Sequence, residues 1–82
     1  MNSKFVAMIN KQQVLDTVFA FTKAKGYPPT AKEVFGYVQA ESFSTVYRFL
    51  NELQAEGYIR FEGSHPKRAI ILKYEQLNKN VF

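Results

Sequence analysis

The chain has 82 residues, a formal net charge of +4, 46% hydrophobic residues and no cysteine. A chain this short builds one small core with little room for an enzyme cleft beside it, and without cysteine that core has no disulfides or thiolate metal ligands. No apolar run approaches the roughly 20 residues of a membrane span, so we expect a cytoplasmic protein without membrane contact, and the basic excess modestly favours a polyanionic partner.

The first predicted element is an amphipathic helix over residues 10–25. Its apolar side chains recur at the spacing of one helix face: Val14, Leu15, Val18 and Phe19. Asn10 and Gln13 have the spacing of an N-cap and its capping-box partner. Met8 and Ile9 could extend the helix upstream, so its start stays open.

A break and a second, short helix follow. Gly26 can take the positive φ that ends a helix, and each residue before a proline of the pair at 28–29 is pushed to extended geometry. Thr30 and Glu33 form a T-x-x-E capping box, which predicts a helix over residues 31–37. Its expected buried residues are Val34, Phe35 and Val38.

The third helix has the clearest pattern and is expected over residues 42–56, with Ser42 as its cap and Gly57 as its stop. Its buried face comprises Val46, Phe49, Leu50 and Leu53. Phe43 could contact the core or project toward a partner, and we expect core contact.

Two segments with alternating side chains, 58–62 and 68–74, are separated by a polar turn and predict a β-hairpin. In a two-stranded hairpin only one of the alternating sets can face the core. We therefore expect Ile70 and Leu72 to point inward and Ile71 to point outward.

Three helices followed by a hairpin are the layout of a winged helix-turn-helix. We therefore predict an α+β fold, a three-helix winged helix-turn-helix with a C-terminal two-stranded β-hairpin wing over residues 58–74. The DNA-binding domain is predicted to span residues 1–74. Residues 75–82 lack strong periodicity and are expected to form a loosely held tail.

The exposed face of the third helix predicts contact with duplex DNA, because the first turns of a recognition helix present side chains to base edges. Arg48 can bond guanine O6 and N7 bidentately, and Thr45 can also touch a thymine methyl group. The base-contacting residues predicted from this face are Ser44, Thr45, Tyr47 and Arg48. The alternative stays open that this is the ordinary solvated face of an amphipathic helix.

Basic and polar residues elsewhere are candidates for phosphate contacts. Lys67 and Arg68 lie at the hairpin turn, while Thr30 and Lys32 begin the second helix, where free N–H groups attract anions. The predicted phosphate-contacting residues are Thr30, Lys32, Asn51, Lys67 and Arg68. The wing cations could instead serve only to keep a β-edge from aggregating, and Thr30 is more securely a cap.

The sequence contains no pattern typical of a catalytic site or a metal site. His65 is the only histidine, without a cysteine or a second histidine to share a metal. Ser42, Ser44 and Ser64 have no neighbouring base in sequence, and no glycine-rich phosphate loop or paired-carboxylate arrangement appears. We therefore expect neither an enzyme nor a cofactor, and no small-molecule substrate.

Over residues 10–74 the chain resembles a known family, the N-terminal winged-helix DNA-binding domain of LexA-type SOS repressors. The shared motifs are Gly26-Tyr27-Pro28-Pro29-Thr30 with Glu33-Val34, then Ser42, Val46, Leu50, Leu53, Gly57 and Ile59, and the wing strand Pro66-Lys67-Arg68-Ala69-Ile70. By position, the resemblance implies base contacts at Ser42, Ser44, Thr45, Tyr47 and Arg48, and wing contacts near Lys67 and Arg68.

Two departures from that family affect the expected function. Its repressors continue into a self-cleaving, dimerising Ser-Lys domain after an Ala-Gly cleavage site, whereas this chain ends at Phe82 with neither. We therefore expect no self-cleavage. Phe43, Tyr47 and Arg48 also make the start of the third helix bulkier and more aromatic than the resemblance implies.

The resulting hypothesis is a small transcriptional regulator, a repressor of bacterial or mobile-element origin, that binds double-stranded DNA sequence-specifically through residues 42–56 and the wing. A homodimer or a protein partner would raise its affinity, with Ile71, Val81 and Phe82 as candidate contacts. The alternative is a protein-interaction module, an anti-repressor or adaptor, that keeps the winged-helix fold and binds a protein through exposed aromatic side chains.

Overall fold

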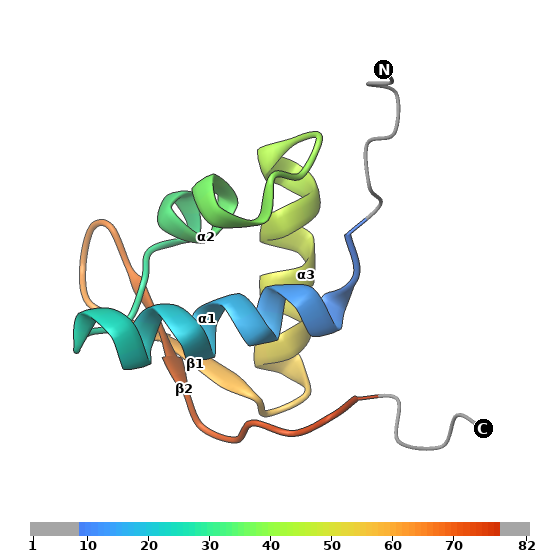
Figure 1. Ribbon diagram of the computed structural model, residues 1–82. Helices are drawn as coiled ribbons and strands as arrows, with labels where there is room; N and C mark the ends of the chain where they lie inside the picture. The colour runs from blue at the N-terminus through green and yellow to red at the C-terminus, as the bar shows by residue number, and fades with distance from the viewer. Residues whose placement is uncertain (1–8, 78–82) are drawn as a thin grey trace.

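The computed structural model describes residues 9–77, which form three helices followed by a two-stranded antiparallel sheet (Figure 1). In chain order the elements are α1 Lys11–Lys25, α2 Ala31–Val38, α3 Phe43–Ala55, β1 Ile59–Glu62 and β2 Arg68–Ile71. This arrangement confirms the predicted α+β winged helix-turn-helix, although both strands are shorter than expected. Within the described residues, no helix has the length and apolar character needed to cross a membrane.

Local hydrogen bonds set the start of α2 as the sequence predicts, and they also set the start of α1, which the sequence left open. Asn10 accepts from the N–H of Gln13 at 2.9 Å and donates its own N–H to Gln13 Oε1 at 2.8 Å. Because Asn10 has extended backbone, α1 begins at Lys11 and not upstream. Thr30 and Glu33 form the equivalent box, with bonds of 3.1 and 2.9 Å.

The helix ends and the start of α3 follow from equally local chemistry. Gly26 takes a left-handed conformation, with φ 84°, and ends α1. The second helix runs one residue further than expected, to Val38, and ends where Gln39 takes a left-handed φ of 54°. Ser42 caps α3 by accepting from the N–H of Thr45 at 3.4 Å.

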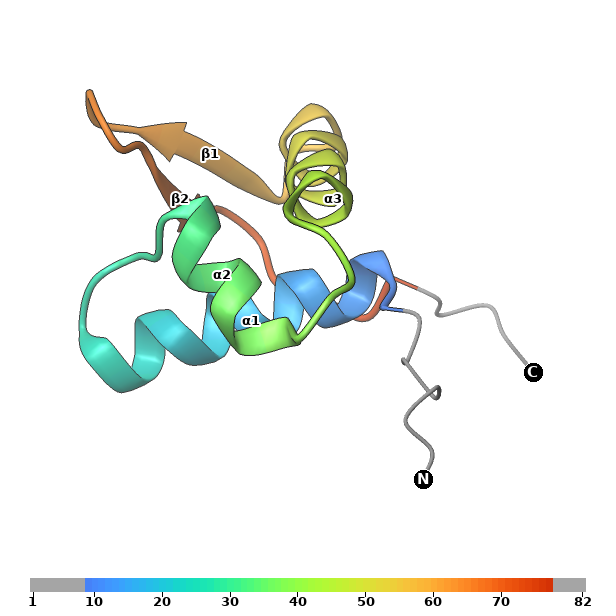
Figure 2. The ribbon, with the colours of Figure 1, turned by 90° about the horizontal axis from the view of Figure 1, so that it is seen from above.

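The other elements all lie on one side of α1, and the core lies between them and α1 (Figure 2). Its buried members are Val14, Leu15, Val18, Val34, Val46, Leu50, Leu53, Ile59 and Ala69. Three side chains expected in the core are only partly buried against it: Phe35, Val38 and Phe49. The helices therefore meet through small and medium aliphatic side chains, while most aromatic rings lie nearer the surface.

The inward face of β2 differs from the expected one. The strands pair with Ile59 opposite Ile71, and Ile71 packs against the core together with the buried Ala69. The expectation that Ile70 and Leu72 point inward is therefore wrong, and Leu72 is 49% exposed just beyond the strand. Because directly paired residues share one face of a sheet, the burial of Ile59 brings Ile71 inward and turns Ile70 to the other face.

A junction around Arg68 ties the hairpin to the start of α2. Arg68 Nη1 donates to the carbonyl oxygen of Pro28 at 2.8 Å and to Glu33 Oε1 at 3.2 Å. One residue on, the N–H of Ala69 donates to the carbonyl oxygen of Pro29 at 2.7 Å. The extended segment created by the two prolines therefore pairs with β2, and this pairing places the hairpin turn beside α2.

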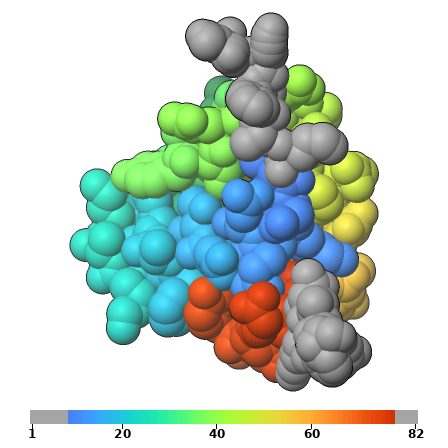
Figure 3. Space-filling view, turned by 45° about the vertical axis from the view of Figure 1, so that its right-hand side comes forward, coloured from blue at the N-terminus to red at the C-terminus, as the bar shows by residue number. Residues whose placement is uncertain are grey.

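The segment after β2 folds back along α1 (Figure 3). The Tyr74 ring stacks on Phe19, with centroids 4.1 Å apart and planes inclined by 3°. The N–H of Leu77 donates to Gln12 Oε1 at 2.6 Å, and the Leu77 side chain packs against the core. The packed part of the chain thus continues past the predicted domain boundary at residue 74.

The first prediction concerns the inward face of β2. Ile71→Ala should lower the free energy of unfolding by about 2 kcal/mol, the low end for truncating a core isoleucine, because Ile71 is only partly buried. Leu72→Ala should change it by less than about 0.5 kcal/mol, since that side chain is largely in water. Urea unfolding followed by circular dichroism measures both. A larger loss for Leu72→Ala would contradict the assigned face.

The second prediction concerns pH and Glu33. The hydrogen bond from the Thr30 N–H, together with the nearby Arg68 charge, holds the pKa of Glu33 below its ordinary value of 4.5. A carboxyl whose pKa is lowered by folding stabilises the fold above its ordinary pKa. That contribution is lost as the pH falls through the folded-state value.

Glu33→Gln should therefore weaken the decrease in unfolding free energy between about pH 6 and about pH 3. Urea titrations at each pH measure that decrease. Glu41→Gln is the matched control, because Glu41 is exposed and forms no ion pair among residues 9–77. If the Glu33→Gln protein shows the same pH dependence as the unsubstituted one, Glu33 does not carry the effect.

Candidate nucleic-acid interface

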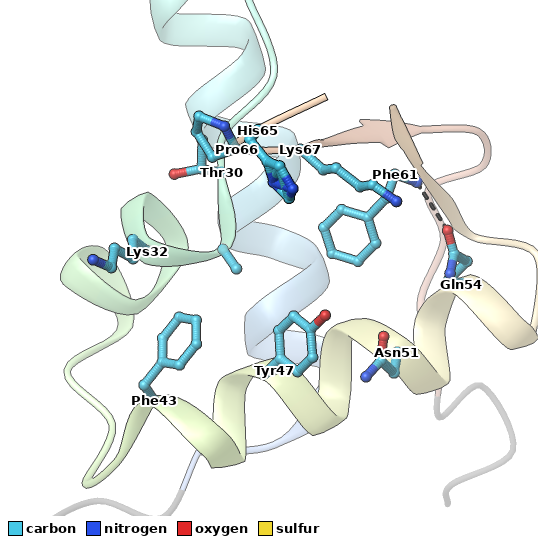
Figure 4. Close-up of a pocket in the computed structure, with 11 residues that line it drawn as sticks. Thr30, Lys32, Phe43, Tyr47, Asn51, Gln54, Phe61, His65, Pro66 and Lys67 are labelled. Atoms are coloured by element: carbon cyan, nitrogen blue, oxygen red, sulfur yellow. Dashed lines mark hydrogen bonds between the residues drawn. The ribbon is translucent and has the colours of Figure 1, made fainter. Parts of the chain in front are cut away.

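A groove of about 650 Å³ lies between the start of α2, one side of α3 and the hairpin (Figure 4). From α3 it is lined by Phe43, Tyr47, Asn51 and Gln54. From the start of α2 and from the hairpin it is lined by Thr30, Lys32, Phe61, His65 and Lys67, among others. The tie between β2 and the start of α2 brings these elements together, so the groove exists only in the folded chain.

The groove is lined by cationic side chains and, among residues 9–77, by no acidic one. Lys32 from α2 and Lys67 from the hairpin turn both line it and are exposed, and neither forms an ion pair with any described residue. His65 lies beside Lys67 on the same turn. Because two separate elements each contribute a lysine, the groove has a local positive character that a polyanion can use.

Three neighbouring aromatic rings, from α3 and β1, line the groove. Phe43 and Tyr47 stack with centroids 5.8 Å apart, and Tyr47 lies 6.4 Å from Phe61 of β1. Phe35 of α2 meets Phe43 edge to face at 5.8 Å. Phe43 remains 38% exposed, so it contacts a core-packed ring on one side and the groove on the other. The expected core contact of Phe43 is therefore made only through the Phe35 ring, and contact with a partner stays a prediction.

The predicted base-contacting residues do not all lie in the groove. Tyr47 lines it, whereas Ser44 and Arg48 are exposed on the adjoining surface of α3. The hydroxyls at the helix start bond to one another, with Ser42 Oγ 3.2 Å from Ser44 Oγ and 3.1 Å from Thr45 Oγ1. These side chains are therefore partly committed to the cap of α3.

Arg48 is exposed and paired within its own helix. Its side chain is 60% exposed, and its Nη1 lies 3.3 Å from Glu52 Oε2 one turn along α3. Its guanidinium carbon also lies 4.7 Å from the centre of the Phe49 ring. The guanidinium therefore lies on the outer surface of α3, outside the groove lining.

The predicted phosphate-contacting residues fall into two groups. Lys32, Asn51 and Lys67 line the groove. Thr30 also lines it but is only 7% exposed, and its hydroxyl accepts from the Glu33 N–H as the cap of α2. Arg68 is outside the groove lining, where it is bonded to Pro28 and Glu33 and lies over the Tyr27 ring at 5.3 Å.

Sequence reasoning missed Gln54 and Phe61 as members of the site. The Phe61 N–H donates to Gln54 Oε1 at 2.9 Å, so this bond ties β1 to the last turn of α3 beside the groove. The spacing of Phe43, Tyr47, Asn51 and Gln54 along one side of a helix could have indicated Gln54. No local pattern could have indicated Phe61, because its place depends on how the hairpin packs against α3.

No group of three or more His, Cys, Asp or Glu side chains within residues 9–77 is arranged to hold a metal ion. The groove offers aromatic faces, amides and ammonium groups. Groups of these kinds can contact nucleic acid, ammonium groups at phosphates and aromatic or polar groups at bases.

Comparison with known proteins identifies relatives with the same domain. Residues 9–69 match the family described as the LexA DNA binding domain. The chain is 37% identical over 70 residues to a LexA repressor of Desulforamulus reducens, covering 85% of this chain and 32% of that protein. It is 37% identical over 67 residues to a LexA repressor of Halalkalibacterium halodurans, covering 82% and 32% of the two chains.

A LexA repressor of a Geobacillus species is 40% identical over 62 residues, which cover 76% of this chain and 30% of that protein. The chain therefore spans about a third of the length of the curated relatives it matches. The family match covers the three helices and every residue that lines the groove. The chain belongs to the LexA DNA-binding domain family.

Proposed function

We propose that this chain binds duplex DNA sequence-specifically through α3 and the hairpin wing, and that it acts as a transcriptional repressor in the cytoplasm. Membership in the LexA DNA-binding domain family supports the binding. The relatives named LexA repressor support the regulatory role. The single structural observation that carries the proposal is the groove beside α3, which two different elements each line with a lysine and which no acidic side chain of the described residues lines.

In this proposal the exposed surface of α3 enters the major groove, and the wing lies along the neighbouring backbone. Lys32 and Lys67 line the groove beside that surface, from α2 and from the hairpin, and contact phosphates, as does Asn51 of α3. Arg68 supports the interface by holding the hairpin in place, because its guanidinium is already bonded within the protein. Thr30 supports it in the same way, as the cap of α2.

Arg48 can serve as the guanine reader even though it is paired with Glu52. An exposed ion pair within a helix contributes about 0.3–0.5 kcal/mol, whereas a bidentate contact with guanine contributes about 1–3 kcal/mol of base discrimination. Breaking the ion pair between Arg48 and Glu52 therefore costs less free energy than the contact with guanine provides. Glu52 also bonds to Lys11 at 3.3 Å, so its carboxylate keeps a partner when Arg48 moves.

Two copies on paired half-sites would give the affinity that one copy lacks. A single small module of this type buries about 600–1,000 Å² on DNA, which supports only modest binding. We therefore propose a homodimer or a protein partner on adjacent half-sites. Of the candidate contacts for this, Ile71 is packed against the core, and Val81 and Phe82 lie outside the described residues.

The third prediction tests the phosphate contacts. Lys67→Ala should weaken binding to all duplex sequences alike and reduce the slope of log affinity against log salt by about 0.9, the value for one lost phosphate contact. Fluorescence anisotropy with a labelled duplex at several salt concentrations measures this slope. Lys23→Ala removes the same charge from α1, outside the groove lining, and should leave the slope unchanged. Equal slopes for Lys67→Ala and Lys23→Ala would argue against the wing contact.

The fourth prediction tests base recognition by Arg48. Selection of preferred sites from a random duplex library should give a site with a required guanine, and Arg48→Ala should relax the preference at that base pair by about 1–3 kcal/mol. The preferences elsewhere in the site should persist, because other side chains read them. An unchanged preference at every position would show that Arg48 reads no base.

The same titrations separate this function from a protein-interaction module. A protein that uses its exposed aromatic side chains only for a protein partner should show no salt-sensitive affinity for duplex DNA. The absence of such affinity even at low salt would overturn the proposed function.

A further inference from the structure

An aromatic pair near the start of α3 is partly exposed to solvent. Phe43 and Tyr47 are 38% and 47% exposed, and their rings stack with planes inclined by 26°. They lie one helical turn apart and face the groove between α3 and the hairpin (Figure 4). This arrangement leaves a continuous apolar surface on the side of α3 that the proposed function directs at DNA.

Neighbouring elements hold the pair in place from both ends. Phe35 of α2 meets the Phe43 ring edge to face, with planes inclined by 89°. Phe61 of β1 lies 6.4 Å from the Tyr47 ring, and the Phe61 backbone is itself bonded to Gln54. Because packed rings have little rotamer freedom left to lose, a ligand can bind against them at a small entropic cost.

The polar groups of the same helical turns are less free than the rings. The hydroxyls of Ser42, Ser44 and Thr45 bond to one another, and Arg48 is paired with Glu52. A base edge that uses one of these groups must replace an interaction that already exists. The Phe43 ring has no polar interaction to lose, so its exposed surface is available to an apolar group.

We infer that the pair formed by Phe43 and Tyr47 recognises the C5-methyl group of thymine in the major groove. This inference rests on the proposed function and names the bases that the site prefers at these positions. The thymine methyl is the apolar group that base pairs present in the major groove, and phenylalanine is one of the side chains that contact it. Polar base edges placed against the rings would lose water without gaining a hydrogen bond, which disfavours the other bases.

Lys32 and Lys67 fit this assignment because both line the groove that contains the pair. Phosphate contacts on either side would hold one DNA strand against the rings. The lysines would raise the affinity for every duplex sequence by the same factor, whereas the rings would raise it only where a thymine methyl group faces them. The two contributions can therefore be separated by experiment.

The experiment replaces thymine by deoxyuridine, one position at a time, in the best duplex from the site selection. Deoxyuridine keeps the base pair and every hydrogen-bonding group and lacks only the methyl. At the positions facing the pair, each replacement should weaken binding about fourfold, because one buried methyl contributes about 0.8 kcal/mol and about 1.4 kcal/mol corresponds to a factor of ten. Fluorescence anisotropy at fixed salt measures the ratio.

Two variants assign the effect to the rings. Phe43→Ala should reduce the ratio of thymine to deoxyuridine affinity toward one, while Tyr47→Phe, which keeps the ring, should preserve it. Circular dichroism establishes that each variant is folded, and the deoxyuridine series on the unsubstituted protein decides the matter if Phe43→Ala does not fold.

Equal affinity for thymine and deoxyuridine at every position, with duplex binding intact, would overturn this inference and leave the proposed function standing. A selected site without thymine would do the same. If the protein shows no salt-dependent affinity for any duplex, the inference and the proposed function both fail.

Discussion

The interface depends on one junction, where the backbone after two prolines pairs with the second strand of the hairpin. The Pro29 carbonyl accepts from the Ala69 N–H, and Arg68 bonds to both Pro28 and Glu33. Prolines cannot continue a helix, so their segment is extended and has carbonyls free to bond with a strand. This junction fixes the hairpin beside α2, and the groove results from that placement.

Within the interface, similar side chains have different tasks because their surroundings differ. Arg68 and Lys67 are neighbours in sequence, but the first is bonded within the protein and the second is exposed at the groove. Thr30 and Lys32 differ in the same way at the start of α2, as a buried cap and an exposed cation. A basic or polar residue near DNA can thus serve either the shape of the interface or the binding itself.

Two independent observations support the proposed function. Family membership comes from sequence similarity that covers the helices and most of the hairpin. The groove comes from the geometry of the fold, with cations on two elements and aromatic rings between them. A net charge of +4 would be weak support alone, but two exposed cations, Lys32 and Lys67, line this groove and give it a local positive character.

The start of α2, the break at the prolines and the fold class could be predicted from the sequence alone, because capping and backbone restriction act over three or four residues and are visible in the local pattern. The tertiary structure decided which face of β2 is buried, since Ile71 turns inward through its pairing with Ile59. Packing also places the Arg68 guanidinium against Pro28 and Glu33 and brings Phe61 into the groove lining. Those outcomes depend on contacts between segments far apart in the chain, which no local pattern of residues encodes.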